Sequence, residues 1–339
     1  MPLKVIAITI FILSGLLVFG QGPMPMHYQI YDLGPTQDDG TRYLTDVNDL
    51  YECITFDDEG LIYDFIDVRG WTTQSLKLLP QFMRGYLRGI NNYGEIVGTN
   101  QTLEGNRNIV AVYYASPYAN PQEILLQFPG SIARDINEDR QIVGTYFAEN
   151  PPFDGRAFLW DNGEFVDLGF EQESDAVSIN NKGGVVGHYK LAHSDKYHGF
   201  YVTKKGPIKD LRPQEIGSSY AKNINNNDWI VGTSTYNERG DFHATLWLGT
   251  GVYDLGVLPG YVESTAYGIN DHNIIVGESH WNNILRAFCW VQGGMYDLND
   301  RIDKDSGWTL QEAFEINERN AIVGYGIFQG ETHHFIMVP

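Results

Sequence analysis

The stretch GINNYGEIVGT at residues 89–99 decides the fold, because the chain repeats it at a nearly fixed interval. Its core, Ile-Asn-x-x-Gly-x-Ile-Val-Gly, returns five more times, and DVNDLYECITF at 46–56 is a diverged seventh copy. The aligned asparagines are Asn48, Asn91, Asn137, Asn180, Asn225, Asn270 and Asn317. They lie 43, 46, 43, 45, 45 and 47 residues apart, and such a period indicates a repeat architecture.

Two further blocks share this period. One is typified by RAFLW at 156–160 and HATLW at 243–247, and the other by VDLG at 166–169 and YDLG at 253–256. Each block is short, rich in β-branched or aromatic residues and flanked by turn residues, as expected for a strand. A looser segment, rich in Ser and Ala, precedes each Ile-Asn. Four strands in about 45 residues are typical of a β-propeller blade.

The repeated asparagine is interpreted as turn chemistry within a tight hairpin. The slot three residues after it holds Gly94, Gly183, Asn273, Asn320 and Asp228 in five copies. Gly, Asn and Asp tolerate a left-handed backbone, so one positive-φ position explains these copies. Arg140 occupies the slot in another copy, and it predicts a slightly different turn there.

The chain ends predict a closed ring. HYQIYDLG at 27–34 is a fourth strand with no blade before it, and HHFIMV at 333–338 is a third strand with no fourth strand after it. Pairing of the two completes the last blade and removes exposed sheet edges. We therefore predict an all-β, seven-bladed β-propeller of four-stranded antiparallel blades. Six blades with an irregular start are the alternative, because the first two copies depart from the pattern.

The repeats resemble the HAF family of bacterial extracellular repeats, named for a His-Ala-Phe signature. Here the signature reads His243-Ala244-Thr245 and His198-Gly199-Phe200, with Arg in the His place at 156–158 and 286–288. The likeness covers nearly all of residues 27–339. It implies a secreted repeat protein and says little about activity.

The first twenty residues predict a leader. Lys4 precedes an apolar run, VIAITIFILSGLLVF at 5–19, which suits a signal-peptide core and is short for a membrane span. Small residues place a cut between Gly20 and Gln21. We expect a signal peptide over 1–20, a single propeller domain over 21–339, and a secreted or periplasmic protein without membrane insertion after cleavage. An uncleaved N-terminal anchor is the alternative.

Composition excludes several classes of protein. The chain has 23 Lys and Arg against 43 Asp and Glu, a net charge of −20. This disfavours nucleic acid as a partner, because phosphates are recognised through basic surfaces. Hydrophobic residues make up 42% of the chain and charged residues 19%, which allows a sizeable core. No strong catalytic or phosphate-binding motif is present, and we predict a monomer without a cofactor.

The histidines and cysteines fit structural roles. His198, His243, His333 and His334 lie at or beside the slot that begins the third strand. A His or Arg in this slot is expected to bond a neighbouring carbonyl or carboxylate. The candidate carboxylates are those of the fourth strands: Asp32, Asp167, Asp210, Asp254 and Asp297. Cys53 and Cys289 occupy apolar repeat positions in blades that are not neighbours, so we expect two buried free thiols rather than a disulfide.

A binding site is expected among residues that break the repeat. The most variable segments join the second strand of each unit to the third, and they gather on one face of a propeller. The candidate ligand-binding residues on this loop face are His188, His193, Asp195, Glu238, Arg239, Asp241, Glu278, His280 and Trp281. Asp303 and Asp305 faintly resemble the start of a calcium loop but lack its later Glu. The catalytic residues, if any, are unknown.

These observations predict a secreted, non-catalytic binding or scaffolding module for a protein or glycan ligand. A rigid ring with variable loops on one face suits recognition. The alternative is a secreted carbohydrate-active hydrolase or lyase. Such an enzyme would need two carboxylates, or a His–carboxylate pair, within reach across blades. A deep axial pocket with convergent Asp, Glu and His would favour the enzyme.

Overall fold

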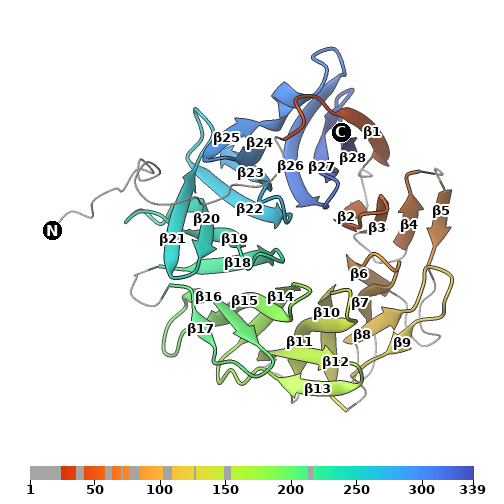
Figure 1. Cartoon of the computed structure of the whole chain (residues 1–339), viewed down its shortest axis with the longest axis vertical. Coiled ribbons are helices and arrows are strands. Elements are labelled where there is room, and N and C mark those ends of the chain that lie inside the picture. Colours follow the sequence, from red (N-terminus) through yellow and green to blue (C-terminus); the bar gives the residue numbers. More distant parts are fainter. Residues whose placement is uncertain are drawn as a thin grey trace.

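The computed structural model describes residues 24–35, 42–57, 63–69, 72–76, 84–101, 109–125, 127–148, 154–212 and 217–339. These residues form seven four-stranded antiparallel sheets, which are the blades of a β-propeller around a central axis (Figure 1). Seven blades confirm the predicted fold and exclude the six-bladed alternative. The predicted leader, residues 1–20, lies outside the described residues.

Within each blade the strands follow one another outward from the axis. Blades one and two comprise β2 (Arg42–Val47), β3 (Glu52–Asp57), β4 (Tyr63–Asp67), β5 (Thr72–Ser75), then β6 (Arg84–Ile90), β7 (Ile96–Gln101), β8 (Ile109–Tyr114) and β9 (Gln122–Glu123). Blades three and four comprise β10 (Gly130–Ile136), β11 (Gln141–Phe147), β12 (Gly155–Asp161), β13 (Glu164–Asp167), then β14 (Ser174–Ile179), β15 (Gly184–Lys190), β16 (Tyr197–Thr203) and β17 (Lys209–Asp210). Blades five and six comprise β18 (Ser219–Ile224), β19 (Ile230–Thr235), β20 (Phe242–Leu248), β21 (Gly251–Gly256), then β22 (Glu263–Ile269), β23 (Ile275–Trp281), β24 (Ile284–Val291) and β25 (Gly294–Asp297). Blade seven comprises β26 (Trp308–Ile316), β27 (Ile322–Phe328), β28 (Glu331–Val338) and β1 (Gln29–Pro35), and a 3₁₀ turn, η1 (Leu298–Arg301), precedes it.

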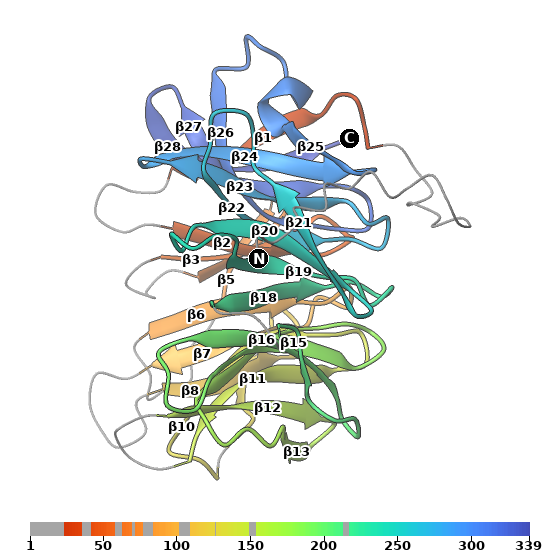
Figure 2. The same cartoon turned by 90° about the vertical axis from the view of Figure 1, so that its left-hand side faces the viewer.

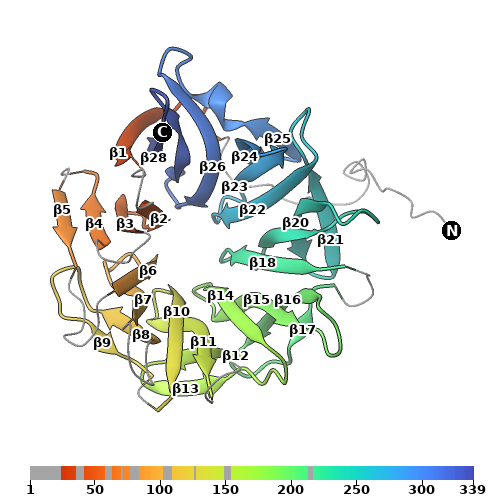
Figure 3. The same cartoon turned by 180° about the vertical axis from the view of Figure 1, so that it is seen from behind.

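The two chain ends close the ring, as predicted. Strand β1 pairs antiparallel with β28, with Gln29 opposite Val338 and Tyr31 opposite Ile336. Figures 1 and 3 show β1 beside β28 from the two sides of the ring. The sheet of the last blade therefore takes its outer strand from the opposite end of the chain.

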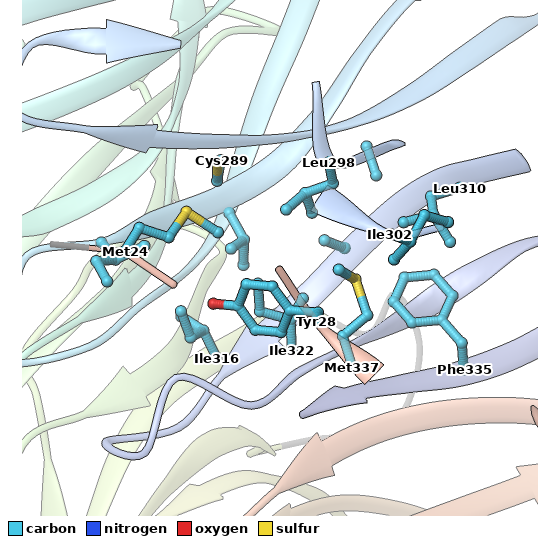
Figure 4. Packing of buried hydrophobic residues seen from close by; sticks show 14 residues of the cluster. Met24, Tyr28, Cys289, Leu298, Ile302, Leu310, Ile316, Ile322, Phe335 and Met337 are labelled. Carbon is cyan, nitrogen blue, oxygen red and sulfur yellow. The ribbon is translucent and has the colours of Figure 1, made fainter. Parts of the chain in front are cut away.

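The segment before β1 also enters the core. Met24 and Tyr28 belong to a buried cluster shared by blades six and seven, in which Tyr28 is 1% exposed. Figure 4 shows the Tyr28 ring among Ile316, Ile322 and Met337. The Tyr28 backbone N–H donates to the carbonyl of Arg301 at 2.8 Å. The N-terminal segment thus contributes apolar burial as well as strand pairing.

The seven asparagines shape the turns between the first and second strands. In Asn225, for example, Oδ1 accepts from the backbone N–H of Asn227 at 3.0 Å and of Trp229 at 2.9 Å. The slot three residues later has positive φ in every blade: Tyr51, Gly94, Arg140, Gly183, Asp228, Asn273 and Asn320. Arg140, at φ 61°, adopts the same turn as the others, so the different turn predicted for it is wrong. Its guanidinium Nε donates to Glu95 Oε1 of the preceding blade at 2.6 Å.

The same asparagines join neighbouring blades, a role the sequence did not reveal. Each Nδ2 donates to the backbone carbonyl of the corresponding asparagine in the next blade, and Asn317 completes the circuit to Asn48. A second circuit uses the following residue, whose backbone N–H donates to the side chain of its counterpart in the next blade. Its members are Asp49, Asn92, Glu138, Asn181, Asn226, Asp271 and Glu318. Two closed belts of hydrogen bonds therefore circle one rim of the ring.

The outer strands confirm the expected role of the His slot. His198, His243 and His333 place Nδ1 within 3.1 Å of Asp210, Asp254 and Asp32, respectively. Arg286 fills the slot in blade six and lies 3.6 Å from Asp297. Cys53 and Cys289 are both free and fully buried, as predicted.

Candidate functional site

A cavity on the axis is the strongest candidate site. The strands run along the ring axis (Figure 2), so the turns after the first strands and the loops after the second strands lie on opposite faces. The cavity, about 480 Å³, is lined by inner-strand and first-turn residues, among them Asp49, Asn92, Glu138 and Glu318 of the second belt. It therefore extends to the face opposite the variable loops.

A β-bulge in each inner strand supplies the residues that line the cavity. In every first strand the pairing register skips the residue three before the repeated asparagine. The skipped residues are Thr45, Arg88, Arg134, Val177, Lys222, Tyr267 and Phe314, and all seven line the cavity. A bulge re-aims a side chain out of the regular sheet alternation. Here the same device, repeated in each blade, presents seven different residues to one space.

Three acids form a ring of carboxylates one residue beyond the bulge. Asp46 accepts from the backbone N–H groups of Val47 at 2.7 Å and of Ile90, in the next blade, at 2.8 Å. Asp135 repeats this arrangement in blades three and four. Glu315 accepts from its own strand and, at 2.7 Å, from Asn223 Nδ2. Asp46 and Asp135 thereby link the inner strands of neighbouring blades, whereas Glu315 of blade seven reaches the inner strand of blade five.

Burial shifts the pKa values of these acids upward. It raises the pKa of Asp46 to about 7, with a further contribution from the nearby charge of Asp135. Burial likewise raises the pKa of Asp135 to about 6, and it raises the pKa of Glu315 well above its usual range. Because three carboxylates near one axis repel one another, they resist ionising together.

Three cations lie among the bulge residues. Arg134 pairs with Asp175 at 2.8 Å, whereas no acid lies within ion-pair distance of Lys222 Nζ among the described residues. Burial lowers the pKa of Lys222, and the nearby charge of Arg134 lowers it further. With Arg88, these residues place three cations in the wall of the cavity, which also contains six acids: Asp46, Asp49, Asp135, Glu138, Glu315 and Glu318.

Two glutamates adjoin this wall between blades six and seven. Glu278 on β23 is 7% exposed, and its Oε1 accepts from the Tyr267 hydroxyl at 3.1 Å. Its Oε2 is buried without a hydrogen-bond partner among the described residues. Glu312 on β26 is hydrogen-bonded to Tyr325, and burial, with the charge of Glu278, raises its pKa to about 8. Burial raises the pKa of Glu278 too.

None of the nine predicted loop-face residues lines the cavity, and two of them, Glu278 and His280, lie together, with 3.8 Å between Glu278 Oε1 and His280 Nδ1. Glu278 belongs to the glutamate pair just described. His188 packs its ring against Tyr197 and Tyr220, and burial lowers its pKa to about 4. His280 Nε2 lies 2.9 Å from Glu263 Oε2. The other six lie in loops or at strand ends: His193, Asp195, Glu238, Arg239, Asp241 and Trp281. Their role in binding stays a prediction.

The calcium candidates lie away from the axis. Asp303 and Asp305 follow η1, and Asp303 Oδ1 lies 3.7 Å from His27 Nε2. Within the described ranges, no group of three His, Cys, Asp or Glu side chains is placed to hold a metal ion. No helix in those ranges is long and apolar enough to cross a membrane.

Sequence reasoning missed the inner-strand residues. The bulge slot holds Thr, Arg, Arg, Val, Lys, Tyr and Phe in the seven copies, and this variation is the signal that could have revealed it. The residues predicted from the sequence lie in the second strands and in the loops that follow them, whereas the inner strands converge on the axis more closely than any loop.

Comparisons with known proteins support the propeller fold and do not assign the chain to a family. No family model matches the chain, and no curated protein sequence matches it. Virginiamycin B lyase from Staphylococcus aureus is similar in structure, with a TM-score of 0.58, 12% identity, and coverage of 92% of this chain and 100% of the lyase. Oligogalacturonate lyase from Vibrio parahaemolyticus gives a TM-score of 0.56, 10% identity, and coverage of 92% and 97%. YCF48, solved with a bound peptide, gives a TM-score of 0.56 and 10% identity, with coverage of 92% of this chain and 97% of YCF48. At these identities the likeness supports the propeller fold alone.

Proposed function

We propose that this chain is an exported HAF-type repeat protein that binds a polar, carbohydrate-sized ligand in its axial cavity. The observation that carries the proposal is the cavity itself. Its volume of about 480 Å³ falls within the roughly 300–1,000 Å³ of small-molecule sites. Its wall combines charged groups, hydroxyls, amides and two aromatic rings, as carbohydrate recognition requires.

The contrast between the repeated and the variable positions of the inner strands supports this proposal. The first belt uses asparagine in every blade, and the second uses Asp, Asn or Glu. This limited choice of side chains suits a rigid frame. The bulge slot of the same inner strands differs from blade to blade, which suits recognition of one asymmetric molecule. A second candidate function, a carbohydrate-active hydrolase or lyase, is favoured by the carboxyl groups of Asp46, Asp135 and Glu315, which line the cavity together.

A glycan-binding screen on residues 21–339 tests the proposal, with calorimetry on each hit and with calcium or a chelator present. Val177→Phe projects an aromatic ring into the cavity, and Val252→Phe makes the same change at an exposed position on β21. We expect Val177→Phe to weaken binding at least tenfold and Val252→Phe to leave it unchanged. A chain that binds no glycan, or a hit weakened by Trp281→Ala and not by Val177→Phe, refutes the axial site. Loss of binding with the chelator would instead implicate Asp303 and Asp305.

A further inference from the structure

Lys222, Tyr267 and Phe314 belong to three consecutive blades, and all three line the axial cavity. They occupy the bulge slot of β18, β22 and β26, inner strands that pack against one another in that order. One cation is therefore followed around the ring by two aromatic rings. The same slot holds Thr45 and Val177 in other blades, so the fold itself requires neither a charge nor an aromatic ring there.

The ammonium group of Lys222 is a half-buried cation. The charges that act on it are those of Arg134, Asp175 and Glu312, and no acid lies within ion-pair distance of Nζ among the described residues. Asp175 is already bound by Arg134 through two hydrogen bonds, at 2.8 and 3.3 Å. A charge that is removed from water without a partner is unfavourable. Lys222 is therefore available to an anion that enters the cavity.

The two aromatic rings are held by contacts outside the cavity. The Tyr267 hydroxyl donates to Glu278 Oε1 at 3.1 Å, and the Phe314 ring packs against that of Tyr325 with 5.6 Å between the ring centroids. Both side chains are half-buried, so each ring leaves part of its surface to the cavity. An aromatic face carries partial negative charge, and the C–H groups on one face of a sugar ring are attracted to it.

The six acids of the cavity wall all lie nearer the first turns than Lys222 does. Three follow the bulge slot by one residue and three follow it by four: Asp46, Asp135 and Glu315, then Asp49, Glu138 and Glu318. Each inner strand runs toward its first turn, so these later residues lie closer to the face on which the turns gather. Carboxylates accept hydrogen bonds from hydroxyl groups and repel anions. A negative charge is therefore favoured at Lys222, and hydroxyl groups are favoured between Lys222 and the first turns.

We propose that the axial cavity binds a terminal uronic acid of a glycan, with the sugar carboxylate on Lys222 and the sugar ring against Tyr267 and Phe314. This inference rests on the proposed function, since it names the class of sugar that occupies the same cavity. A carboxylate suits the site better than a phosphate, because a second negative charge would add to the repulsion from the six acids. A terminal sugar suits it better than an internal one, because further charged sugars of the same chain would lie beside those acids.

Calorimetry on the purified protein tests the charge of the ligand. The probes are D-glucuronate and D-galacturonate, the two uronamides, which keep the shape without the charge, and the 6-phosphates of glucose and galactose. We expect at least one uronate to bind about tenfold or more tightly than its amide, the scale of a hydrogen bond between charged groups. A uronamide or 6-phosphate that binds as tightly as the uronate overturns the inference.

Two further outcomes separate this inference from the proposed function. Neutral sugars that bind better than uronates, and lose binding in Val177→Phe, overturn the inference and leave the proposed function intact. A chain that binds no sugar at all overturns both. At equal mass, galacturonate oligomers should bind in proportion to their number of chain ends, whereas binding that does not depend on chain length would contradict recognition of a terminal sugar.

Variants assign the roles. Lys222→Met should weaken uronate binding about tenfold or more and leave uronamide binding unchanged, whereas Lys222→Arg should keep the preference for the acid. Tyr267→Leu should weaken both ligands equally, because it removes the stacking surface and not the charge. The matched control is Lys304→Met, at an exposed position after η1, which should bind both ligands like the unmodified chain. If Lys222→Met melts like the unmodified chain and weakens uronate and uronamide equally, or weakens neither, Lys222 does not hold the carboxylate.

Discussion

Replacing Asn225 by Asp separates the two roles of the repeated asparagine. Asn225 is 4% exposed. Its Oδ1 accepts two backbone N–H groups of its own turn, whereas its Nδ2 donates to Asn270 O and Asn273 Oδ1 of the next blade, each at 2.9 Å. Asp keeps the turn acceptor and turns the donor into an oxygen that faces two other oxygens. The variant therefore tests the link between blades alone.

The structure sets the expected size of the effect. Two hydrogen bonds are lost, and two buried acceptors in blade six lose their donor, at about 1–3 kcal/mol for each unsatisfied group. We therefore expect Asn225→Asp to lower the free energy of unfolding by about 2–5 kcal/mol. Asn225→Ala should cost more, because it also removes the turn acceptor. With an unfolding entropy of about 2.1 cal/mol/K per residue, each kcal/mol lowers the melting temperature of this chain of 339 residues by roughly 1–2 °C.

Thermal and urea unfolding measure these differences. The control is Asn282→Asp, an exposed turn residue at φ 50°, a conformation that Asp tolerates. It should melt with the unmodified chain. If Asn225→Asp also melts with the unmodified chain while Asn225→Ala does not, the asparagine is turn chemistry alone. The circuit of donors between blades would then contribute nothing to stability.

Three other outcomes follow from the fold. Tyr28→Ala should lower the free energy of unfolding by about 3–5 kcal/mol, the cost of removing a large buried ring, whereas Tyr118→Ala, at a position 72% exposed, should leave it unchanged. Equal melting temperatures of the two variants would contradict closure by the N-terminal segment. Burial raises the pKa values of Asp46 and Glu318 to about 7, so the folded chain keeps protons that the unfolded chain releases above about pH 4. The melting temperature should therefore fall as pH rises from 5 to 8, although His188, with its lowered pKa, acts in the opposite direction below about pH 6.5. A melting temperature that rises across this range would show that these buried acids do not hold their protons in the folded chain. Burial raises the pKa of both thiols, so a thiol reagent should label neither cysteine before denaturation and both after it, as mass spectrometry would show.

The fold could be predicted almost completely because the same strand and turn patterns recur in each blade. The period, the hairpin turns and the unpaired strands at the two chain ends together specify seven blades and their closure. The bonds of His198, His243 and His333 to fourth-strand aspartates could also be predicted, since both slots recur with the period. The turn at Arg140 was predicted wrongly because Arg rarely adopts a positive φ, whereas the hydrogen-bond belt around it imposes the common turn.

The axial cavity could not be predicted in the same way. Its lining comes from seven segments about 45 residues apart, and a cavity depends on side-chain volumes that no period encodes. Residues such as Lys222 and Tyr267 also look ordinary in a strand, because alternation alone would not direct them to the axis. The β-bulge that turns them inward leaves no sequence signature beyond the variability of its own slot.

The bulge also explains how this ring can vary its centre without losing its frame. In blades one, three, five and seven, the side chain of the residue after it accepts a backbone N–H of its own strand, and in blades one and three it also accepts one from the next blade. The asparagine two residues later belongs to a belt. Substitutions at either position therefore disturb blade packing. The bulged residue takes no part in the paired register, so its side chain is limited mainly by its neighbours across the axis. A repeat protein under selection for a new ligand would be expected to change first at Thr45, Arg88, Arg134, Val177, Lys222, Tyr267 and Phe314.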